Sequence, residues 1–187
     1  MGLPATAKLQ LTSCQLVVVD MQTRLSTAMP PDDLQQVCKQ TAALLQGAKL
    51  LAIPTIITEQ YPTGLGETLP MLKAHASEAV YVEKTAFSAC GEPRFNQKLH
   101  RDGAQIILTG MEAHICVLQT VLDLTALGKQ VFVVEDAILS RNPNNKTNAV
   151  ARMREAGCII TNTESVLFEC LGHAKHEAFK AISSLIR

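Results

Sequence analysis

The chain has 187 residues, 47% of them hydrophobic, which is enough to bury a core as a single domain. Its 17 lysines and arginines balance its 17 aspartates and glutamates, and neither sign forms a long run, so neither nucleic acid nor a charged membrane is expected as a partner. No stretch approaches the roughly 18 apolar residues of a membrane span, and the N-terminus lacks a basic and then apolar signal, so membrane spanning and secretion are not expected.

The cysteines lie at positions 14, 38, 90, 116, 158 and 170, with no C-x-x-C pair and no zinc-type spacing. Free thiols in a reducing compartment are therefore expected. A mitochondrial transit peptide would be rich in arginine, whereas the start of this chain up to Cys14 contains none. We expect a cytoplasmic protein, with mitochondrial association left open.

Short apolar runs rich in β-branched residues alternate with helical patterns along the chain. The runs are typical of buried parallel strands, and they occupy residues 15–19, 52–57, 80–82, 105–109, 131–135 and 158–161. A helix is expected after Pro30-Pro31-Asp32, another over 149–156 before Gly157, and a third along the apolar stripe of 178–186. This order predicts an α/β protein with a three-layer α/β/α Rossmann-like fold and a six-stranded parallel sheet. We expect one domain over residues 1–187, with 1–13 as a leading segment.

The helix expected over residues 113–127 is apolar almost all the way round. Such a helix must be covered on more than one side. Because a domain of this size rarely surrounds a helix completely, the pattern favours a homo-oligomer that assembles through this helix.

Three segments each carry one reactive side chain at or near the end of an apolar run: Asp20, Lys84 and Cys116. Each alone has an ordinary interpretation, as a turn residue, a surface charge and a core thiol. Together, an acid, an ammonium and a thiol make a nucleophile with the groups that activate it. Cys116 falls in the first turn of an expected helix, where the helix dipole favours an anion.

The sequences around these residues resemble a known family. VVVDMQ, EKTAFSAC and TGMEAHICV look like the Asp, Lys and Cys segments of the isochorismatase-like cysteine hydrolases, in the same order. The resemblance runs from about residue 14 to the C-terminus. TEQYPTGLGET and TESVLFECLG are most similar to the isochorismatase domain-containing protein 2 group.

The resemblance implies an Asp-Lys-Cys triad in which Asp20 is the base, Lys84 the cationic neighbour and Cys116 the nucleophile. It also implies an oxyanion hole made by the backbone N–H groups of Glu112 and Cys116, and a cis peptide bond most plausibly between Met111 and Glu112. The implied reaction is hydrolysis of a small amide, ester or vinyl-ether-like substrate through a covalent thiol intermediate. No cofactor is implied.

Candidate substrate-binding residues are found beside the three segments: Gln22, Gln60, Tyr61, Phe87, Ser88 and His114. A Cys-His dyad is not favoured, because residues two apart on a helix, such as His114 and Cys116, point about 200° from each other. Nicotinamidases of this superfamily carry an Asp-x-His metal motif, and the corresponding residues 58–61 contain no histidine. No metal is expected, and nicotinamide is disfavoured as the substrate.

Two other functions are left open. The first is a non-catalytic oligomeric scaffold that keeps the fold, against which the complete triad argues. The second is a nucleic-acid enzyme, because a related protein carries a mitochondria-associated ribonuclease label. RNA cleavage would call for a basic groove, paired histidines or metal-binding carboxylates, and the zero net charge does not favour it.

Overall fold

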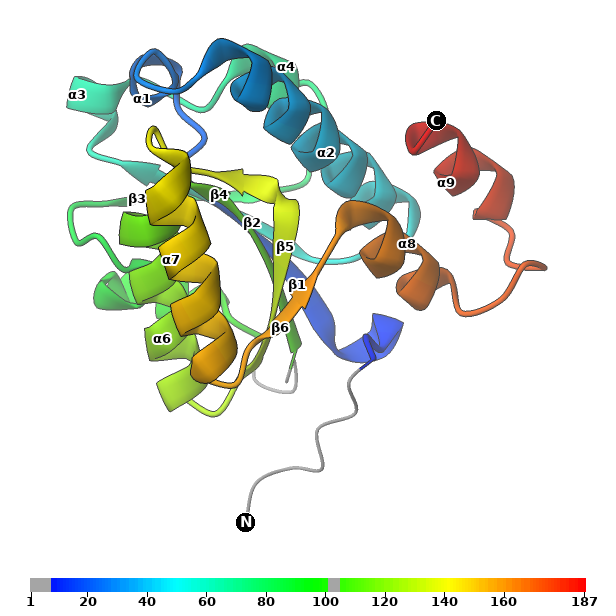
Figure 1. Cartoon of the computed structure of the whole chain (residues 1–187). Coiled ribbons are helices and arrows are strands. Elements are labelled where there is room, and N and C mark those ends of the chain that lie inside the picture. The colour runs from blue at the N-terminus through cyan, green and yellow to red at the C-terminus, as the bar shows by residue number, and fades with distance from the viewer. Residues whose placement is uncertain (1–7, 101–104) are drawn as a thin grey trace.

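The computed structural model describes residues 8–100 and 105–187, so the expected leading segment lies mostly outside the described residues. Six strands form one sheet in which every neighbouring pair is parallel (Figure 1). The strands are β1 (Cys14–Val19), β2 (Thr55–Gln60), β3 (Val80–Lys84), β4 (Gln105–Met111), β5 (Gln130–Leu139) and β6 (Ile159–Thr161). Their order is β3-β2-β1-β4-β5-β6, which confirms the predicted α/β fold with a six-stranded parallel sheet.

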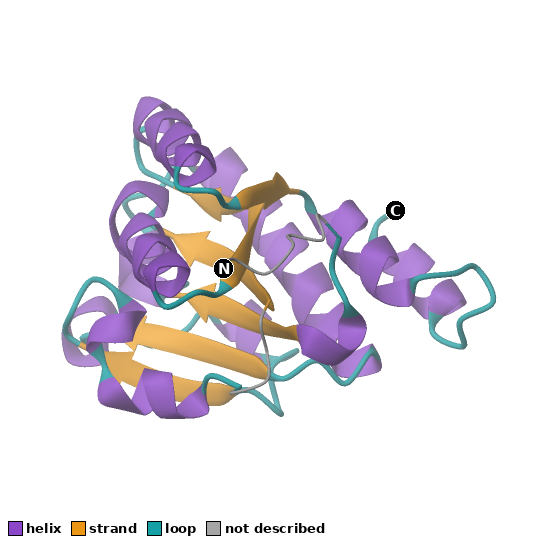
Figure 2. Cartoon of the chain, turned by 90° about the horizontal axis from the view of Figure 1, so that it is seen from below, coloured by secondary structure: helices purple, strands orange, loops and turns teal. Residues whose placement is uncertain are grey.

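Helices cover both faces of the sheet (Figure 2). One layer contains α2 (Pro31–Leu50), α4 (Pro70–Lys73), α8 (Thr163–Leu171) and α9 (Phe179–Leu185), which contact one another through α2. The other contains α5 (Pro93–Lys98), α6 (Leu118–Ala126) and α7 (Pro143–Glu155). The remaining helical turns are η1 (Leu11–Ser13), α1 (Thr23–Ser26), α3 (Pro62–Leu65), η2 (Ala89–Gly91) and η3 (Ala113–Val117). Among the described residues, no helix has the length and apolar character needed to cross a bilayer.

The two faces of β1 belong to two separate cores. Leu16 and Val18 pack in the core beneath α2 and α8, whereas Val17 and Val19 pack in the core beneath α6 and α7. All four side chains are buried, which explains why a central strand appears in the sequence as a continuous apolar run. The functional side chains therefore have to lie at the strand ends.

All six strands differ from their expected bounds, and two of them, β2 and β5, differ by three or more residues at one or both ends. β2 begins at Thr55 rather than at residue 52, because Ala52 adopts a left-handed conformation after α2 (φ 53°). It continues to Gln60 through polar residues that are nonetheless buried. β5 extends to Leu139 through an irregularity in its pairing with β4. Apolar runs in the sequence therefore locate the strands. They do not show where a strand ends when its last residues are polar and buried.

The apolar helix expected over residues 113–127 is composite. It begins as the π-helix η3 and continues as α6, and its buried side packs on β5, α7 and η2 of the same chain. Leu118, Val121 and Leu124 are buried in this way, whereas Leu127 is 59% exposed. Other parts of the same chain therefore cover much of the apolar surface of this helix.

Candidate active site

The reactive side chains lie where the order of the strands reverses. β1 and β4 are central neighbours, and the chain moves outward from them in opposite directions, so their carboxyl ends form the switch point at which such sheets bind ligands. Asp20 follows β1, Cys116 lies in η3 after β4, and Lys84 ends β3. Asp20 has a left-handed backbone (φ 52°), a strained conformation for a non-glycine residue that is common at functional sites.

Asp20 and Lys84 form a fully buried ion pair. Lys84 Nζ lies 2.6 Å from Asp20 Oδ2, and both side chains are 0% exposed. Thr58 Oγ1, on β2, donates to the other carboxylate oxygen at 2.7 Å. Because a charge buried without a partner is costly, the pairing offsets the cost of burying the two groups.

The Lys84 ammonium is surrounded by oxygen acceptors. Besides Asp20, it donates to Gln60 Oε1 at 2.7 Å and to the carbonyl oxygens of Phe87 at 3.0 Å and Ala86 at 3.2 Å. An ammonium has three N–H groups, so the acceptors exceed the donors. This arrangement fixes the amine in place as a cation.

The Cys116 thiol interacts electrostatically with both Asp20 and Lys84 and is 6% exposed. Burial, together with the Asp20 carboxylate, raises the pKa of Cys116 to about 12, and Lys84 only partly opposes this. The direction is opposite to the lowered pKa that a cysteine at a helix start would have. The site therefore holds a neutral thiol next to a carboxylate base at neutral pH, and not a preformed thiolate.

The backbone before the nucleophile is tightly constrained. The peptide bond between Met111 and Glu112 is cis, and Gly110 has φ 128°. A Cβ atom on Gly110 would overlap the carbonyl oxygen of Val19 on the neighbouring strand. Only glycine fits here, and its absence of a side chain lets β4 approach β1 directly behind the site.

Two of the residues expected to bind substrate have their side chains hydrogen-bonded within the protein. Gln22 is fully buried; its Nε2 donates to the carbonyl oxygens of Gln60 and Gly66, and its Oε1 accepts from the Gln60 N–H. Gln60 in turn donates to the Thr85 carbonyl oxygen and accepts from Lys84. The structure thus places this pair behind Lys84, where it supports the ammonium.

The other candidates lie on the loops around the triad. Tyr61 and Phe87 are 56% and 55% exposed, and their backbones hold Lys84: the Tyr61 N–H donates to the Lys84 carbonyl oxygen at 2.9 Å, and the Phe87 carbonyl oxygen accepts from the ammonium. Ser88 is 9% exposed, and its Oγ accepts from the Cys90 N–H at the start of η2. The two exposed rings are therefore available to a ligand, whereas Ser88 caps a turn.

A match to the isochorismatase domain covers residues 14–165, a span that includes all three members of the triad. The chain belongs to the isochorismatase family. Isochorismatase domain-containing protein 2 of Bos taurus is 36% identical over 186 residues, which cover 98% of this chain and 88% of the bovine protein.

Two solved structures extend the comparison. MAR1 ribonuclease of Caenorhabditis elegans is 37% identical, with a TM-score of 0.90 over 96% of this chain and 92% of that one. The YcaC gene product of Escherichia coli, described as an octameric hydrolase of unknown specificity, is 26% identical, with a TM-score of 0.88 over 98% and 91%.

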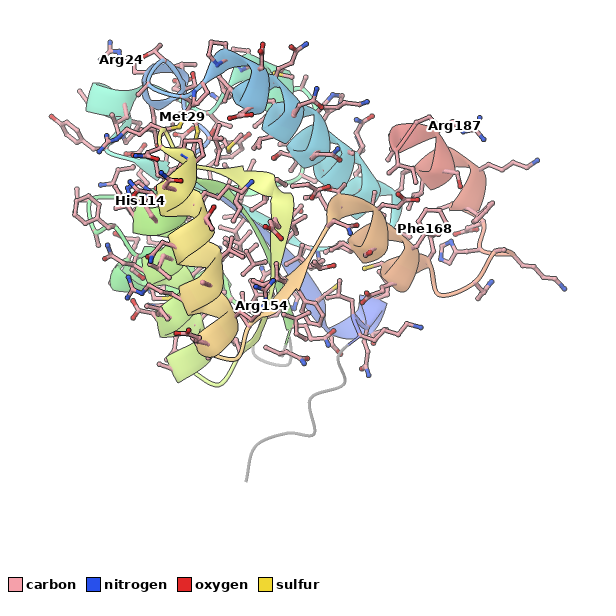
Figure 3. The ribbon with its side chains drawn as sticks, viewed as in Figure 1. Arg24, Met29, His114, Arg154, Phe168 and Arg187 are labelled. Carbon is pink, nitrogen blue, oxygen red and sulfur yellow. The ribbon has the colours of Figure 1, made fainter. Side chains whose placement is uncertain are left out.

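The isochorismatase-family chain also has polar partners of the nucleophile loop that the sequence analysis missed. His114 Nδ1 lies 2.9 Å from Ser140 Oγ, and His114 Nε2 lies 3.3 Å from Asn145 Nδ2. The buried Glu112 carboxylate accepts from the Arg141 N–H at 3.0 Å. Figure 3 labels His114 beside α7, to which η3 packs. No signal in the sequence pairs these segments, because α6 and β5 separate them along the chain.

The site holds no cluster typical of a metal centre. Over residues 8–100 and 105–187, no group of three or more His, Cys, Asp or Glu side chains is arranged to hold an ion. At residues 58–61 the structure has Thr58 bound to Asp20, Gln60 bound to Lys84, and Glu59 Oε1 accepting from Thr68 N and Oγ1. These side chains support the triad and the neighbouring loop.

Proposed function

We propose that the protein is a cysteine hydrolase of the isochorismatase family, acting on a small amide, ester or vinyl-ether-like substrate without a cofactor. The observation that carries this proposal is the buried Asp20–Lys84 ion pair placed against the Cys116 thiol. The family membership and the description of the Escherichia coli relative as a hydrolase support it. That relative is also described as octameric, which supports self-association of this chain.

For an amide or ester substrate, the chemistry starts from the neutral thiol. As Cys116 Sγ attacks the substrate carbonyl carbon, its proton passes to the Asp20 carboxylate, and the new C–S bond forms as the C=O π electrons move onto oxygen. The backbone N–H groups of Glu112 and Cys116 would stabilise that oxyanion. Collapse of the intermediate expels the amine or alcohol, which takes the proton from Asp20 and leaves a thioester. Water then hydrolyses the thioester, with Asp20 as the base, and restores the thiol.

Lys84 has an electrostatic role in this scheme. Its fixed positive charge stabilises the Asp20 carboxylate before proton transfer and the developing negative charge on Cys116 during attack. Gln22 and Gln60 act as positioning residues for the ammonium. Tyr61, Phe87 and His114 are the substrate contacts in this proposal, and the two exposed rings would receive the apolar part of the substrate.

Two alternatives predict different results. A scaffold would keep the fold without turnover. A ribonuclease would act on RNA, as the name of the Caenorhabditis elegans relative indicates for that protein. The balanced charge of this chain and its buried thiol support a small uncharged substrate over a polyanion.

The proposal is tested by incubating the protein with a panel of small amides and esters and measuring hydrolysis, together with intact mass after rapid acid quenching. We expect turnover of at least one compound and a mass increase equal to its acyl group. Cys116→Ser should reduce turnover by at least about a hundredfold. Cys90→Ser, at a partly exposed cysteine outside the triad, is the matched control and should retain activity.

Three outcomes would contradict the proposed hydrolase. Full activity in Cys116→Ser would remove the triad from the mechanism. Cleavage of a labelled RNA that survives in Cys116→Ser, without turnover of any amide or ester, would favour the ribonuclease. If the protein turns over neither the small amides and esters nor RNA, and copies of the chain still associate, the scaffold is favoured.

A further inference from the structure

A cavity of about 550 Å³ lies between the start of α2, the second half of β5 and α7. None of the triad residues lines it. Its walls carry both signs of charge: Asp33 on α2, Glu135 and Asp136 on β5, and Lys146 and Arg154 on α7. We propose that this cavity binds a small zwitterion that carries a carboxylate and an ammonium, such as an amino acid or a short peptide.

The cavity is a product of the irregularity in β5. Leu108 on β4 pairs with Val133, but Gly110 pairs with Ile138, so residues 134–137 of β5 lie opposite Thr109 alone. Such a bulge turns side chains away from the line of the strand, and here it presents Glu135 and Asp136 to the cavity. β6 pairs with β5 only through Phe132–Val134. No β6 residue therefore pairs with the part of β5 that lines the cavity.

Lys146 is a cation on the cavity wall whose side chain has no partner among the described residues. It is only partly exposed, and burial lowers its pKa even though Glu135, Asp136 and Asp33 oppose that shift. Within the described part of the chain, the side chains of Lys146 and Arg154 form neither a hydrogen bond nor an ion pair. An ammonium withdrawn from water without a partner is costly. The carboxylate of a ligand would supply that partner.

The carboxylates that line the cavity are placed to bind the ammonium group of the same ligand. Asp136 uses Oδ1 to accept from the Thr163 N–H and hydroxyl, whereas the carboxylates of Asp33 and Glu135 form no hydrogen bond or ion pair with any described residue. The opposite charges influence one another across the cavity but are too far apart to pair directly. A molecule with both charges would span the gap.

The remaining lining sets the size and character of the ligand. Apolar side chains line part of the cavity, from Val37, Leu139, Val150 and Ala151, and the volume lies in the range of small-molecule sites. Arg154, labelled in Figure 3, lies on α7 near β6. These features favour a zwitterion with an apolar side chain, such as a dipeptide that ends in leucine, over a sugar or an inorganic ion.

The test is isothermal titration of the full chain with L-alanyl-L-leucine, its N-acetyl derivative and its C-terminal amide. We expect saturable binding of the dipeptide and at least tenfold weaker binding of each derivative. Lys146→Gln should weaken dipeptide binding at least tenfold, and in that variant C-amidation should cost little more, because the amide removes the same interaction. Glu135→Gln should reduce the effect of N-acetylation in the same way.

Arg152→Gln is the matched control, because Arg152 is an exposed cation on the same helix that does not line the cavity. It should bind the dipeptide like the wild type. The proposal is overturned if the dipeptide shows no saturable binding up to about 10 mM, if all three compounds bind equally, or if Arg152→Gln weakens binding as much as Lys146→Gln. It is also overturned if Lys146→Gln and Glu135→Gln change the sedimenting mass while no variant binds peptide, since the cavity would then be a contact between copies.

Discussion

At the scale of single residues, the active site depends on two charges with opposite effects on one thiol. The Asp20 carboxylate raises the pKa of Cys116, and the Lys84 ammonium lowers it. Burial raises the pKa of Cys116 more than the carboxylate does, so the resting thiol is protonated at neutral pH. The catalytic role that we propose for Asp20, that of a base, would promote attack by the thiol, whereas its effect on the pKa of the resting thiol opposes it.

The opposite effects of Asp20 and Lys84 on the thiol predict how fast Cys116 is alkylated. Asp20→Asn removes the carboxylate and leaves the ammonium beside Cys116, so the pKa of the thiol should fall. We expect iodoacetamide to alkylate Cys116 at least about tenfold faster at pH 8, because each unit of pKa changes the thiolate fraction about tenfold. Lys84→Met should raise the thiol pKa and slow alkylation. Both variants should lose hydrolysis. Site-resolved mass spectrometry over pH 6 to about 10 measures the rates, and slower alkylation in Asp20→Asn would show that the carboxylate creates a thiolate in the resting protein.

The residues of the triad could be proposed from the sequence because each ends an apolar run, and parallel strands bring such ends together. Their supporting groups could not be found in this way. Thr58 and Gln60 have the polar character of a loop, yet they belong to a buried strand because they hydrogen-bond to Asp20 and Lys84. Gln22, expected to contact substrate, instead has its amide bound to backbone groups.

At the scale of elements, the geometry behind the nucleophile rests on the close approach of β4 to β1 at Gly110. Gly110→Ala would require a left-handed φ at a residue with a side chain and would push the new Cβ against the Val19 carbonyl oxygen. We expect it to lower the free energy of unfolding by more than about 2 kcal/mol. Urea denaturation followed by circular dichroism measures the change.

Gly128→Ala is the control for this substitution. Gly128 also has a positive φ of 79°, but a Cβ there meets no atom within 4 Å. It should cost about 1 kcal/mol, from the backbone conformation alone. Equal losses at both glycines would mean that the contact with β1 contributes nothing.

The elements themselves were largely predictable. Six apolar runs matched six strands, because a fully buried strand has no polar face to confuse the pattern. The π-helical start of the helix after β4 and the irregularity in β5 were not, since both depend on how neighbouring segments pack. Both irregular segments also lie beside cavities or reactive groups, where local rules are commonly set aside.

At the scale of the whole molecule, the proposed self-association requires a surface that joins copies of the chain. The helix over residues 113–127 was expected to do so, and within the chain its buried side already packs on β5 and α7. What remains outward is a smaller apolar area around Leu127, which is 59% exposed, with Ile115 and Leu122 partly buried. An interface at this helix would be centred on its C-terminal end.

Leu127→Glu tests this location, because a buried carboxylate without a partner would oppose association. We expect the variant to sediment at a lower mass than the wild type at the same concentration. Leu50→Glu is the matched control: Leu50 is 48% exposed at the end of α2 in the opposite layer, and its substitution should leave the assembly intact. If Leu127→Glu sediments like the wild type while Leu50→Glu dissociates, the copies meet through the layer that contains α2, and the apolar pattern of the helix reflects packing within one chain.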